Sequence, residues 1–230
     1  MFLFLQQQNK TMEGEGPVKF YPPKEEKWNI LTHGFGILLS LLAAVLLWIR
    51  AAEFQSTRVT LTFMVFAISL LLLYASSTFY HSAKDPVWRF RLKVLDHIAI
   101  FILIAGTYTP FSLVTLKGTT GWAIFGVAWG IALTGTILKL FFTGKYKTLS
   151  TILYVSMGWI IIAAIKPLLE NLSVGGLWWL FAGGLFYTLG AVLYSINRLK
   201  YNHALFHFFV LFGSFSHFMA IYEHVIPLKN

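Results

Sequence analysis

The chain has 230 residues, a formal net charge of +9 and no cysteine. Hydrophobic residues make up 57% of it and charged residues only 12%, about half of the roughly 25% that is usual in soluble domains. This composition excludes an ordinary water-soluble domain, and the lack of cysteine excludes disulfide bonds and thiolate metal sites. The positive charge does not indicate nucleic-acid binding, because the basic residues lie in short loops between apolar segments.

The first 24 residues are polar and contain three prolines and two glycines. They are predicted to form a flexible N-terminal tail, and residues 25–230 a single transmembrane domain. The stretch Met1–Leu5 is apolar but too short for the core of a signal peptide. The first membrane span is therefore expected to act as an uncleaved insertion signal.

Seven stretches without Asp, Glu, Lys or Arg follow the tail, each at least 18 residues long. A helix needs about 20 apolar residues to cross the roughly 30 Å hydrocarbon core of a bilayer. The predicted fold class is therefore an all-α integral membrane protein, a bundle of seven transmembrane helices in which consecutive helices are antiparallel. The spans are expected at residues 29–50, 58–81, 95–115, 119–141, 148–167, 175–197 and 203–225.

Two features predict how the spans pack. Pro110 should distort the second half of the third span, because it removes a backbone donor inside a helix. Gly126 and Gly130 have the small-xxx-small spacing that lets the fourth span approach a neighbour closely.

The loop charges predict the orientation of the bundle. If the N-terminus is cytoplasmic, thirteen Lys and Arg residues fall on the inner side and five on the outer side. Cytoplasmic loops are rich in Lys and Arg, so we expect a multi-pass protein of the cell membrane with a cytoplasmic N-terminus and an external C-terminus. The five outer residues are Arg50, Arg58, Lys117, Lys166 and Lys229.

Polar side chains of three spans gather at the predicted inner membrane face. The second span ends there with Ser77 and His81, the third begins with Asp96, and the seventh begins with His203 and His207. Ionisable groups inside a membrane are costly and usually mark function. A cluster assembled from three spans therefore indicates a functional site.

The histidines predict a zinc site. His203 and His207 are four residues apart on one helix, so both imidazoles can face the same point, as in many zinc sites. His81 would be a third ligand and leave the fourth position open to water, which is the pattern of catalytic zinc. Zinc lowers the pKa of its water to about 7, so this site predicts hydrolysis, of an amide or ester bond in a membrane lipid.

Asp96 and Ser77 are the predicted catalytic residues. Asp96 would either hold a ligand imidazole or the zinc-bound water, or act as the general base for that water. Ser77 would bond to Asp96 or to a reacting carbonyl. The alternatives are that Ser77 bonds only to its own helix and that Asp96 is a topological charge beside Arg89, Arg91 and Lys93.

The remaining histidines receive weaker assignments. His97 points about 100° away from Asp96 on the helix and is left out of the metal site. His217 lies about 15 Å beyond His207 along the helix axis and cannot share its metal. His217 and His224 are predicted to be packed bundle histidines or part of a polar track toward the outside. His33 is predicted to cap or line the site.

The motifs of the chain resemble those of bacterial haemolysin III-related proteins. These proteins belong to the same superfamily as the progestin and adiponectin (PAQR) receptors and the alkaline ceramidases. The resemblance covers nearly all of residues 25–226. It rests on Glu26-x-x-Asn29-x-x-Thr32-His33, Ser77-x-x-x-His81, Leu95-Asp96-His97, Gly106-Thr-Tyr-Thr-Pro110 and His203-x-x-x-His207.

The resemblance implies a seven-helix fold with a cytoplasmic N-terminus and zinc at the positions of His81, His203 and His207. It also implies a water positioned by Asp96 near Ser77. Members of the superfamily are associated with lipid amide hydrolysis, membrane homeostasis and, by historical naming, cytolysis.

Three functions are consistent with these residues. The favoured one is a zinc-dependent membrane hydrolase with a membrane lipid as its substrate. The second is a non-enzymatic regulator of membrane homeostasis in which zinc braces two spans. A channel or cytolysin is least favoured, because polar residues do not continue clearly past the zinc. No nucleic-acid partner is expected, and the sequence carries no signal for an oligomeric state.

Overall fold

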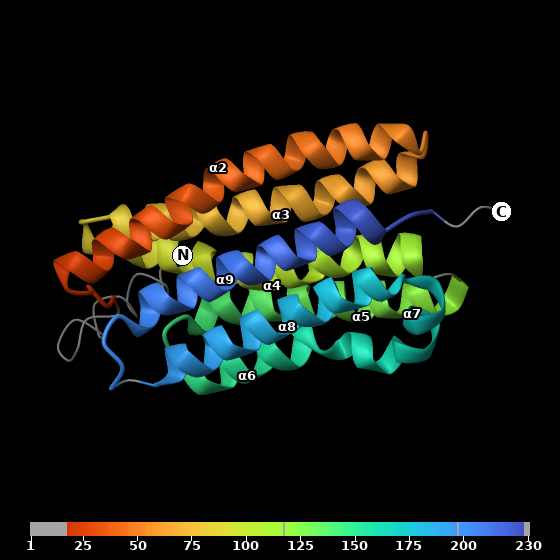
Figure 1. The fold of residues 1–230 in the computed structure, drawn as a ribbon. Coiled ribbons are helices and arrows are strands. Elements are labelled where there is room, and N and C mark those ends of the chain that lie inside the picture. The colour runs from red at the N-terminus through yellow and green to blue at the C-terminus, as the bar shows by residue number, and fades with distance from the viewer. Residues whose placement is uncertain (1–17, 117, 197, 228–230) are drawn as a thin grey trace.

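The computed structural model describes residues 18–116, 118–196 and 198–227, so the predicted tail is described only from residue 18 on. The described residues form helices joined by short loops and contain no strand (Figure 1). The helices are α2 (Pro23–Glu53), α3 (Thr57–Ser82), α4 (Pro86–Pro110), α5 (Gly118–Phe142), α6 (Lys147–Gly158), α7 (Ile165–Asn171), α8 (Val174–Ser195) and α9 (Asn202–Met219).

Among the described residues, seven helical segments are long and apolar enough to cross a membrane, which confirms the predicted all-α seven-span fold. Short turns complete three of these segments. A π-helical turn continues α4, a 3-10 turn joins α6 to α7, and a second π-helical turn extends α9. These turns span Phe111–Thr115, Ile160–Ala164 and Ala220–His224.

The third span begins earlier than predicted, at Pro86 rather than at residue 95. The Asp85 carboxylate caps the helix by accepting a hydrogen bond from the Trp88 backbone N–H at 2.9 Å, and proline is favoured in a first helical turn. Arg89 and Lys93 therefore lie on the helix and are buried. The stretch without charged residues predicts the apolar part of the third span. It does not predict where the helix begins, because the first turns of the helix contain charged residues.

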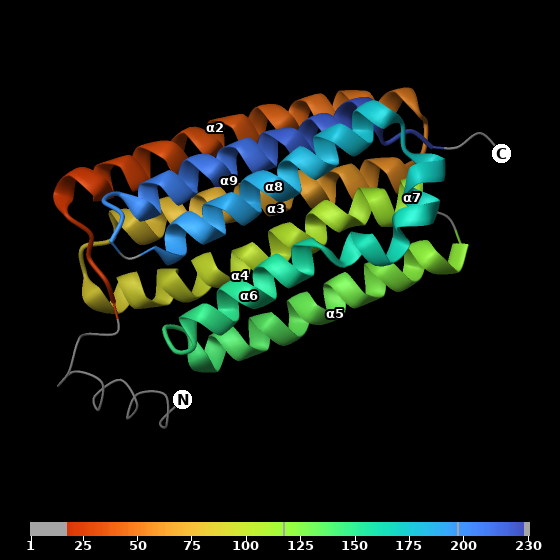
Figure 2. The same cartoon turned by 60° about the horizontal axis from the view of Figure 1, so that its bottom comes forward.

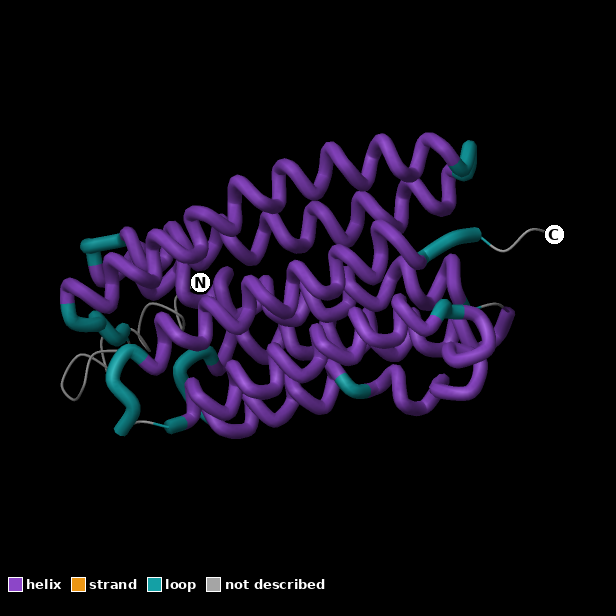
Figure 3. Tube along the Cα trace, in the orientation of Figure 1, coloured by secondary structure: helices purple, strands orange, loops and turns teal. Residues whose placement is uncertain are grey.

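The helices form a closed arrangement. α2, α3 and α4 pack in chain order, α6 and α8 link α4 to α9, and α9 packs back on α2. α5 lies outside against α4 (Figure 2). The loops that join one span to the next gather at the two ends of the bundle (Figure 3). The end where α2, α4 and α9 begin and α3 ends, at the left in Figures 1 and 2, is called the histidine end below.

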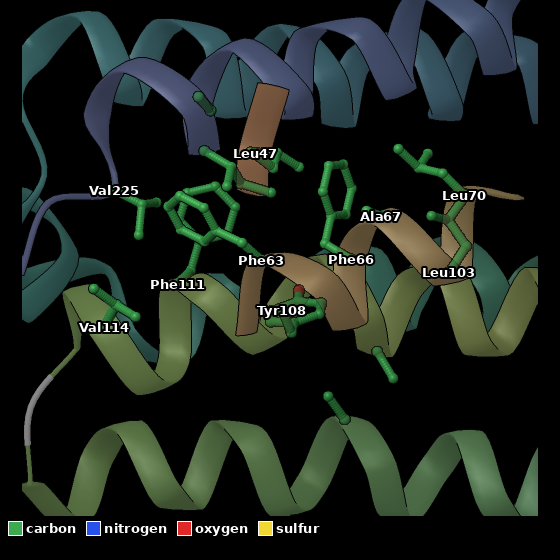
Figure 4. Packing of buried hydrophobic residues seen from close by; sticks show 14 of the residues in the cluster. Leu47, Phe63, Phe66, Ala67, Leu70, Leu103, Tyr108, Phe111, Val114 and Val225 are labelled. Carbon is green, nitrogen blue, oxygen red and sulfur yellow. The ribbon is translucent and has the colours of Figure 1, made fainter. Parts of the chain in front are cut away.

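A hydrophobic core holds the bundle together away from the histidine end. Phe63 and Phe66 of α3 pack near Phe111, and each is at most 1% exposed (Figure 4). Leu47 of α2 and Val225 after α9 belong to the same cluster. Because helices in lipid associate through close packing rather than through exclusion of water, this core fixes α2, α3, α4 and α9 relative to one another.

The fifth span is interrupted near its middle, which the sequence did not predict. α6 ends at Gly158, and its freed backbone groups find a partner in Tyr108 of α4. The Tyr108 hydroxyl donates to Gly158 O at 2.8 Å and accepts from Ile161 N at 3.0 Å. Irregular backbone is tolerated at membrane depth when protein groups satisfy it in this way.

The packing features predicted from the sequence have different outcomes. α4 passes into a π-helical turn directly after Pro110, as a distortion there requires. The prediction for Gly126 and Gly130 is wrong within this chain, because a side chain added at either position would contact nothing within 4 Å. Gly121, one turn earlier on α5, makes the close approach instead, against the carbonyl oxygens of Ser112 and Leu116.

Candidate metal centre

Three imidazoles from two helices converge at the histidine end. Nε2 of His203 lies 2.9 Å from Nε2 of His81 and 3.1 Å from Nε2 of His207. Each of these side chains offers one nitrogen, and the three nitrogens all lie within 4.8 Å of one another. The residues are buried, with at most 8% of their surface exposed. The predicted ligands are therefore brought together in a place where a metal ion can bind.

The local structure explains why these rings meet. His81 lies at the end of α3, and the i, i+4 pair His203 and His207 lies in the first turns of α9. The side-chain amide of Asn202 donates to the carbonyl oxygens of Tyr194 and Ile196, at 3.0 and 3.3 Å. These bonds tie the start of α9 to the end of α8, and so fix the depth at which the two imidazoles face His81.

Glu26 of α2 holds the His81 ring from behind. Its Oε2 accepts a hydrogen bond from His81 Nδ1 at 2.8 Å and another from the Asn29 side-chain amide at 3.2 Å. With the proton on Nδ1, His81 presents the lone pair of Nε2 to the centre. A carboxylate behind a ligand imidazole is the usual way in which proteins orient a zinc-binding histidine.

His207 is held in the same tautomer by α2. Its Nδ1–H donates to the carbonyl oxygen of Asn29 at 3.3 Å, and Thr32 Oγ1 lies equally close. The Nε2 lone pair of His207 therefore also points at the centre. His33 stacks on this ring with centroids 3.5 Å apart and the planes at 9°, so α2 fixes both the tautomer and the tilt of the ligand.

The third ring, His203, is covered by the segment that precedes α2. Tyr21 stacks on it with ring centroids 4.6 Å apart. Burial raises the pKa of the Tyr21 hydroxyl above its ordinary value, so this side chain stays neutral. The Nδ1 of His203 is buried without a hydrogen-bond partner in the described part of the chain.

Arg89 binds Glu26 and the backbone around the three histidines. It forms an ion pair with Glu26 and donates hydrogen bonds to the carbonyl oxygens of His81, Ala83 and Lys19. Its side chain is only 1% exposed. Sequence reasoning treated Arg89 as a loop charge and used Glu26 only as part of a motif. The arginine lies three residues beyond a helix-starting Asp-Pro pair, which is the signal that could have placed it on a helix.

Ser77, one turn before His81 on α3, lies beside Asp96 of α4. The Ser77 hydroxyl is buried close to the Asp96 carboxylate, without a hydrogen bond of regular geometry among the described residues. The place behind His81 is filled by Glu26 and not by Asp96. Glu26, rather than Asp96, therefore orients the His81 imidazole. That Asp96 holds a bound water or acts as its general base stays a prediction.

The remaining histidines are placed by the structure in different surroundings. His33 lines the site, and both of its ring nitrogens are buried without a partner among the described residues. His217 lies further along α9, where its Nε2 donates to Leu180 O at 3.3 Å. His224 contacts Ser173 through a 2.8 Å hydrogen bond. His97 bonds back to its own helix, at Lys93 O.

The donor set fits a divalent ion such as zinc. In His81 and His207 the Nδ1 atom donates a hydrogen bond, so the Nε2 atom is unprotonated and has a free lone pair. The Nε2 atoms of all three histidines converge. A single proton can form a hydrogen bond in only one of the two short contacts, His81–His203 or His203–His207. A cation between the rings can bind all three nitrogens. Tetrahedral zinc at about 2.0–2.1 Å from imidazole places its ligand nitrogens about 3.3 Å apart, close to the 2.9 and 3.1 Å that separate His203 Nε2 from the other two nitrogens.

Comparison with known proteins agrees with this architecture. The sequence model of the haemolysin-III-related family matches residues 21–218, which include α2 to α8, nearly all of α9 and the three histidines. The chain belongs to the haemolysin III-related family. The resemblance inferred from the motifs is thereby confirmed, and the haemolysin III-type chain is a multi-pass membrane protein.

Individual relatives cover nearly the whole chain. Hemolysin-3 of Bacillus cereus is 44% identical over 207 residues, which is 90% of this chain and 94% of the relative. A hemolysin-3 homolog of Bacillus subtilis (strain 168) is 44% identical over 205 residues, or 89% and 96% of the two chains. The human monocyte to macrophage differentiation factor is 27% identical over 210 residues, 87% of this chain and 84% of its own.

Proposed function

We propose that this haemolysin III-related protein is a zinc-dependent hydrolase that acts on an amide or ester bond of a membrane lipid. The observation that supports this most directly is the convergence of three buried imidazole nitrogens, two of them held as acceptors by α2. His81, His203 and His207 would hold the ion. A zinc ion held by these three residues would supply Lewis-acid chemistry.

The protein's own groups would prepare the site for this reaction. Glu26 and Asn29 orient the two ligand rings and keep their Nδ1 protons in place. Asp96 would accept a proton from the attacking water at a carboxylate oxygen, with the neighbouring Ser77 hydroxyl donating to the carboxylate or to the substrate carbonyl. The same carboxyl group would then give this proton to the departing amine or alcohol as the acyl bond breaks. Asn29, Ser77 and the three histidines are buried, while Glu26 and Asp96 are partly buried, so polar contacts among the buried groups are screened little by water.

The proposed site would lie at the depth of the inner leaflet of the cell membrane. The histidine end carries most of the basic residues, including Lys27, Lys84 and Lys200, which are exposed there. By the positive-inside rule this end faces the cytoplasm. A lipid substrate would therefore reach the site from the cytoplasmic leaflet.

The test is hydrolysis by the purified, zinc-loaded protein of lipid amides and esters in mixed micelles. The wild type should release fatty acid, and Asp96→Ala should lower the rate at saturating substrate by about 10²–10⁴-fold without loss of zinc, as expected for removal of a general base. Asp85→Asn, which keeps a capping oxygen on the same helix, is the control. Intact lipids in every reaction of the zinc-loaded wild type would end the catalytic proposal.

A second function is supported by the position of the histidines between helices. α2 packs against both α3 and α9, and the three rings join α3 to α9 directly. An ion there would brace the bundle of a non-enzymatic membrane regulator. In that case zinc removal lowers the unfolding temperature strongly, while Asp96→Ala leaves the cellular phenotype unchanged. Loss of the phenotype in Asp96→Ala, with zinc and stability retained, would favour the hydrolase.

A further inference from the structure

A surface pocket lies directly outside the metal centre, between the start of α2 and the α3–α4 loop. Its volume is about 420 Å³, within the roughly 300–1,000 Å³ range of small-ligand sites. The pocket is lined by His81 and Glu26 on the inner side and by Lys27, Lys84 and Leu31 toward the surface. It therefore connects the outside of the bundle with the back of a metal ligand.

The free charges around the pocket are positive. Glu26 turns inward to His81 and Arg89, and the Asp85 side chain caps α4. Lys27 and Lys84 are exposed, and neither forms an ion pair with any described residue. The rim thus presents two unpaired ammonium groups, whereas the carboxylates of Glu26 and Asp85 already accept hydrogen bonds.

The wall beside these lysines is apolar and accessible. Phe20 is 51% exposed and Leu31 is 49% exposed, and Ile30 continues the same wall. Leu31 and Ile30 belong to α2, a helix apolar enough to cross a membrane. A ligand that matches both the wall and the rim has an acyl chain and a negative headgroup.

We propose that this pocket binds the headgroup region of an anionic membrane lipid. The acyl chain lies along Leu31 and Ile30, and the phosphate lies between the ammonium groups of Lys27 and Lys84. That the bound lipid is also the substrate rests on the proposed function: the bond that links headgroup to acyl chain would then lie beside His81. Binding itself requires neither zinc nor hydrolysis.

The test uses the full-length, metal-depleted protein in nanodiscs. Native mass spectrometry compares the lipids retained from phosphatidylcholine discs and from discs that also contain phosphatidylglycerol. The wild type should retain phosphatidylglycerol selectively. Each lysine near a membrane surface contributes about fivefold in affinity for an anionic lipid, so Lys27→Gln with Lys84→Gln should weaken retention about 30-fold.

The matched control removes the same charge at the same end but outside the pocket, as Arg198→Gln with Lys200→Gln, both of which are exposed. It should retain phosphatidylglycerol as the wild type does. Equal retention by the pocket variant and the wild type, or equal loss in both double variants, would overturn the proposal. If the wild type retains the lipid but hydrolyses none when zinc-loaded, only the proposed enzymatic function fails.

Discussion

Glu26 is the residue that connects the candidate metal centre to its surroundings. One carboxylate oxygen orients His81 and the other pairs with Arg89, which in turn holds the loop after α3 and the segment before α2. A buried cation site built from neutral imidazoles benefits from a carboxylate behind one ligand, because the carboxylate offsets part of the charge of the ion.

Glu26→Gln should weaken zinc binding by about 10- to 100-fold, the usual cost of losing the outer partner of a zinc ligand. The amide retains the shape of the side chain but loses the charge that favours the ion. Competition with a chromophoric chelator measures the affinity. Glu53→Gln, which removes an exposed carboxylate that pairs with Arg50 at the opposite end, should leave the affinity unchanged, and an unchanged affinity in Glu26→Gln would refute the assigned role.

At the residue scale, the sequence predicts the three ligands but not their supports. The i, i+4 spacing places His203 and His207 on one helix face whatever surrounds them, and His81 lies at the matching depth. The partner behind His81 depends on how α2 is rotated against α3, which no spacing within one helix determines. For this reason Asp96 was considered as that partner, whereas Glu26 takes the place.

At the scale of elements, apolar runs predict which segments cross the membrane but not which side of a helix packs. α5 is apolar on all sides, so its sequence does not distinguish a lipid-facing side from a packed one. Gly126 and Gly130 turned out to face open space, while Gly121 contacts the backbone after Pro110. The break after Gly158 was missed for a related reason, since its partner Tyr108 lies on another helix.

Gly121→Ala should destabilise the protein by about 1–3 kcal/mol, the usual cost of overpacking. The added methyl group would meet backbone carbonyl oxygens of Ser112 and Leu116, which cannot rotate away. Gly126→Ala on the same helix has free space and a better helix former, so its stability should equal or slightly exceed that of the wild type. Thermal unfolding in detergent compares the two, and equal midpoints would contradict the described packing of α5.

At the scale of the whole molecule, the buried polar site and the hydrophobic core lie at different ends of the bundle. The aromatic core near Phe63 and Phe111 fixes the helices, and the histidine end carries the buried polar site. The sequence predicts the polar end, because the polar side chains of the second, third and seventh spans lie at matching depths, but it does not predict where the aromatic core lies. The orientation of the bundle in the membrane is a separate prediction.

The orientation can be tested by labelling, because the natural chain has no cysteine. Ser82→Cys at the histidine end and Thr57→Cys at the opposite end are both exposed. In intact cells a membrane-impermeant maleimide should label Thr57→Cys only, and permeabilisation should be required for Ser82→Cys. Labelling in the reverse order would place the metal centre at the external face and contradict the proposed orientation.

The most direct test of the metal centre is elemental analysis of the purified protein. The wild type should contain about one zinc ion per chain, and His81→Ala and His203→Ala/His207→Ala should lose it because each removes ligands from the same three-nitrogen cluster. His224→Ala, which lies outside the cluster, should retain the metal. Wild-type protein without stoichiometric metal after zinc loading, or full metal content in the cluster variants, would contradict the account.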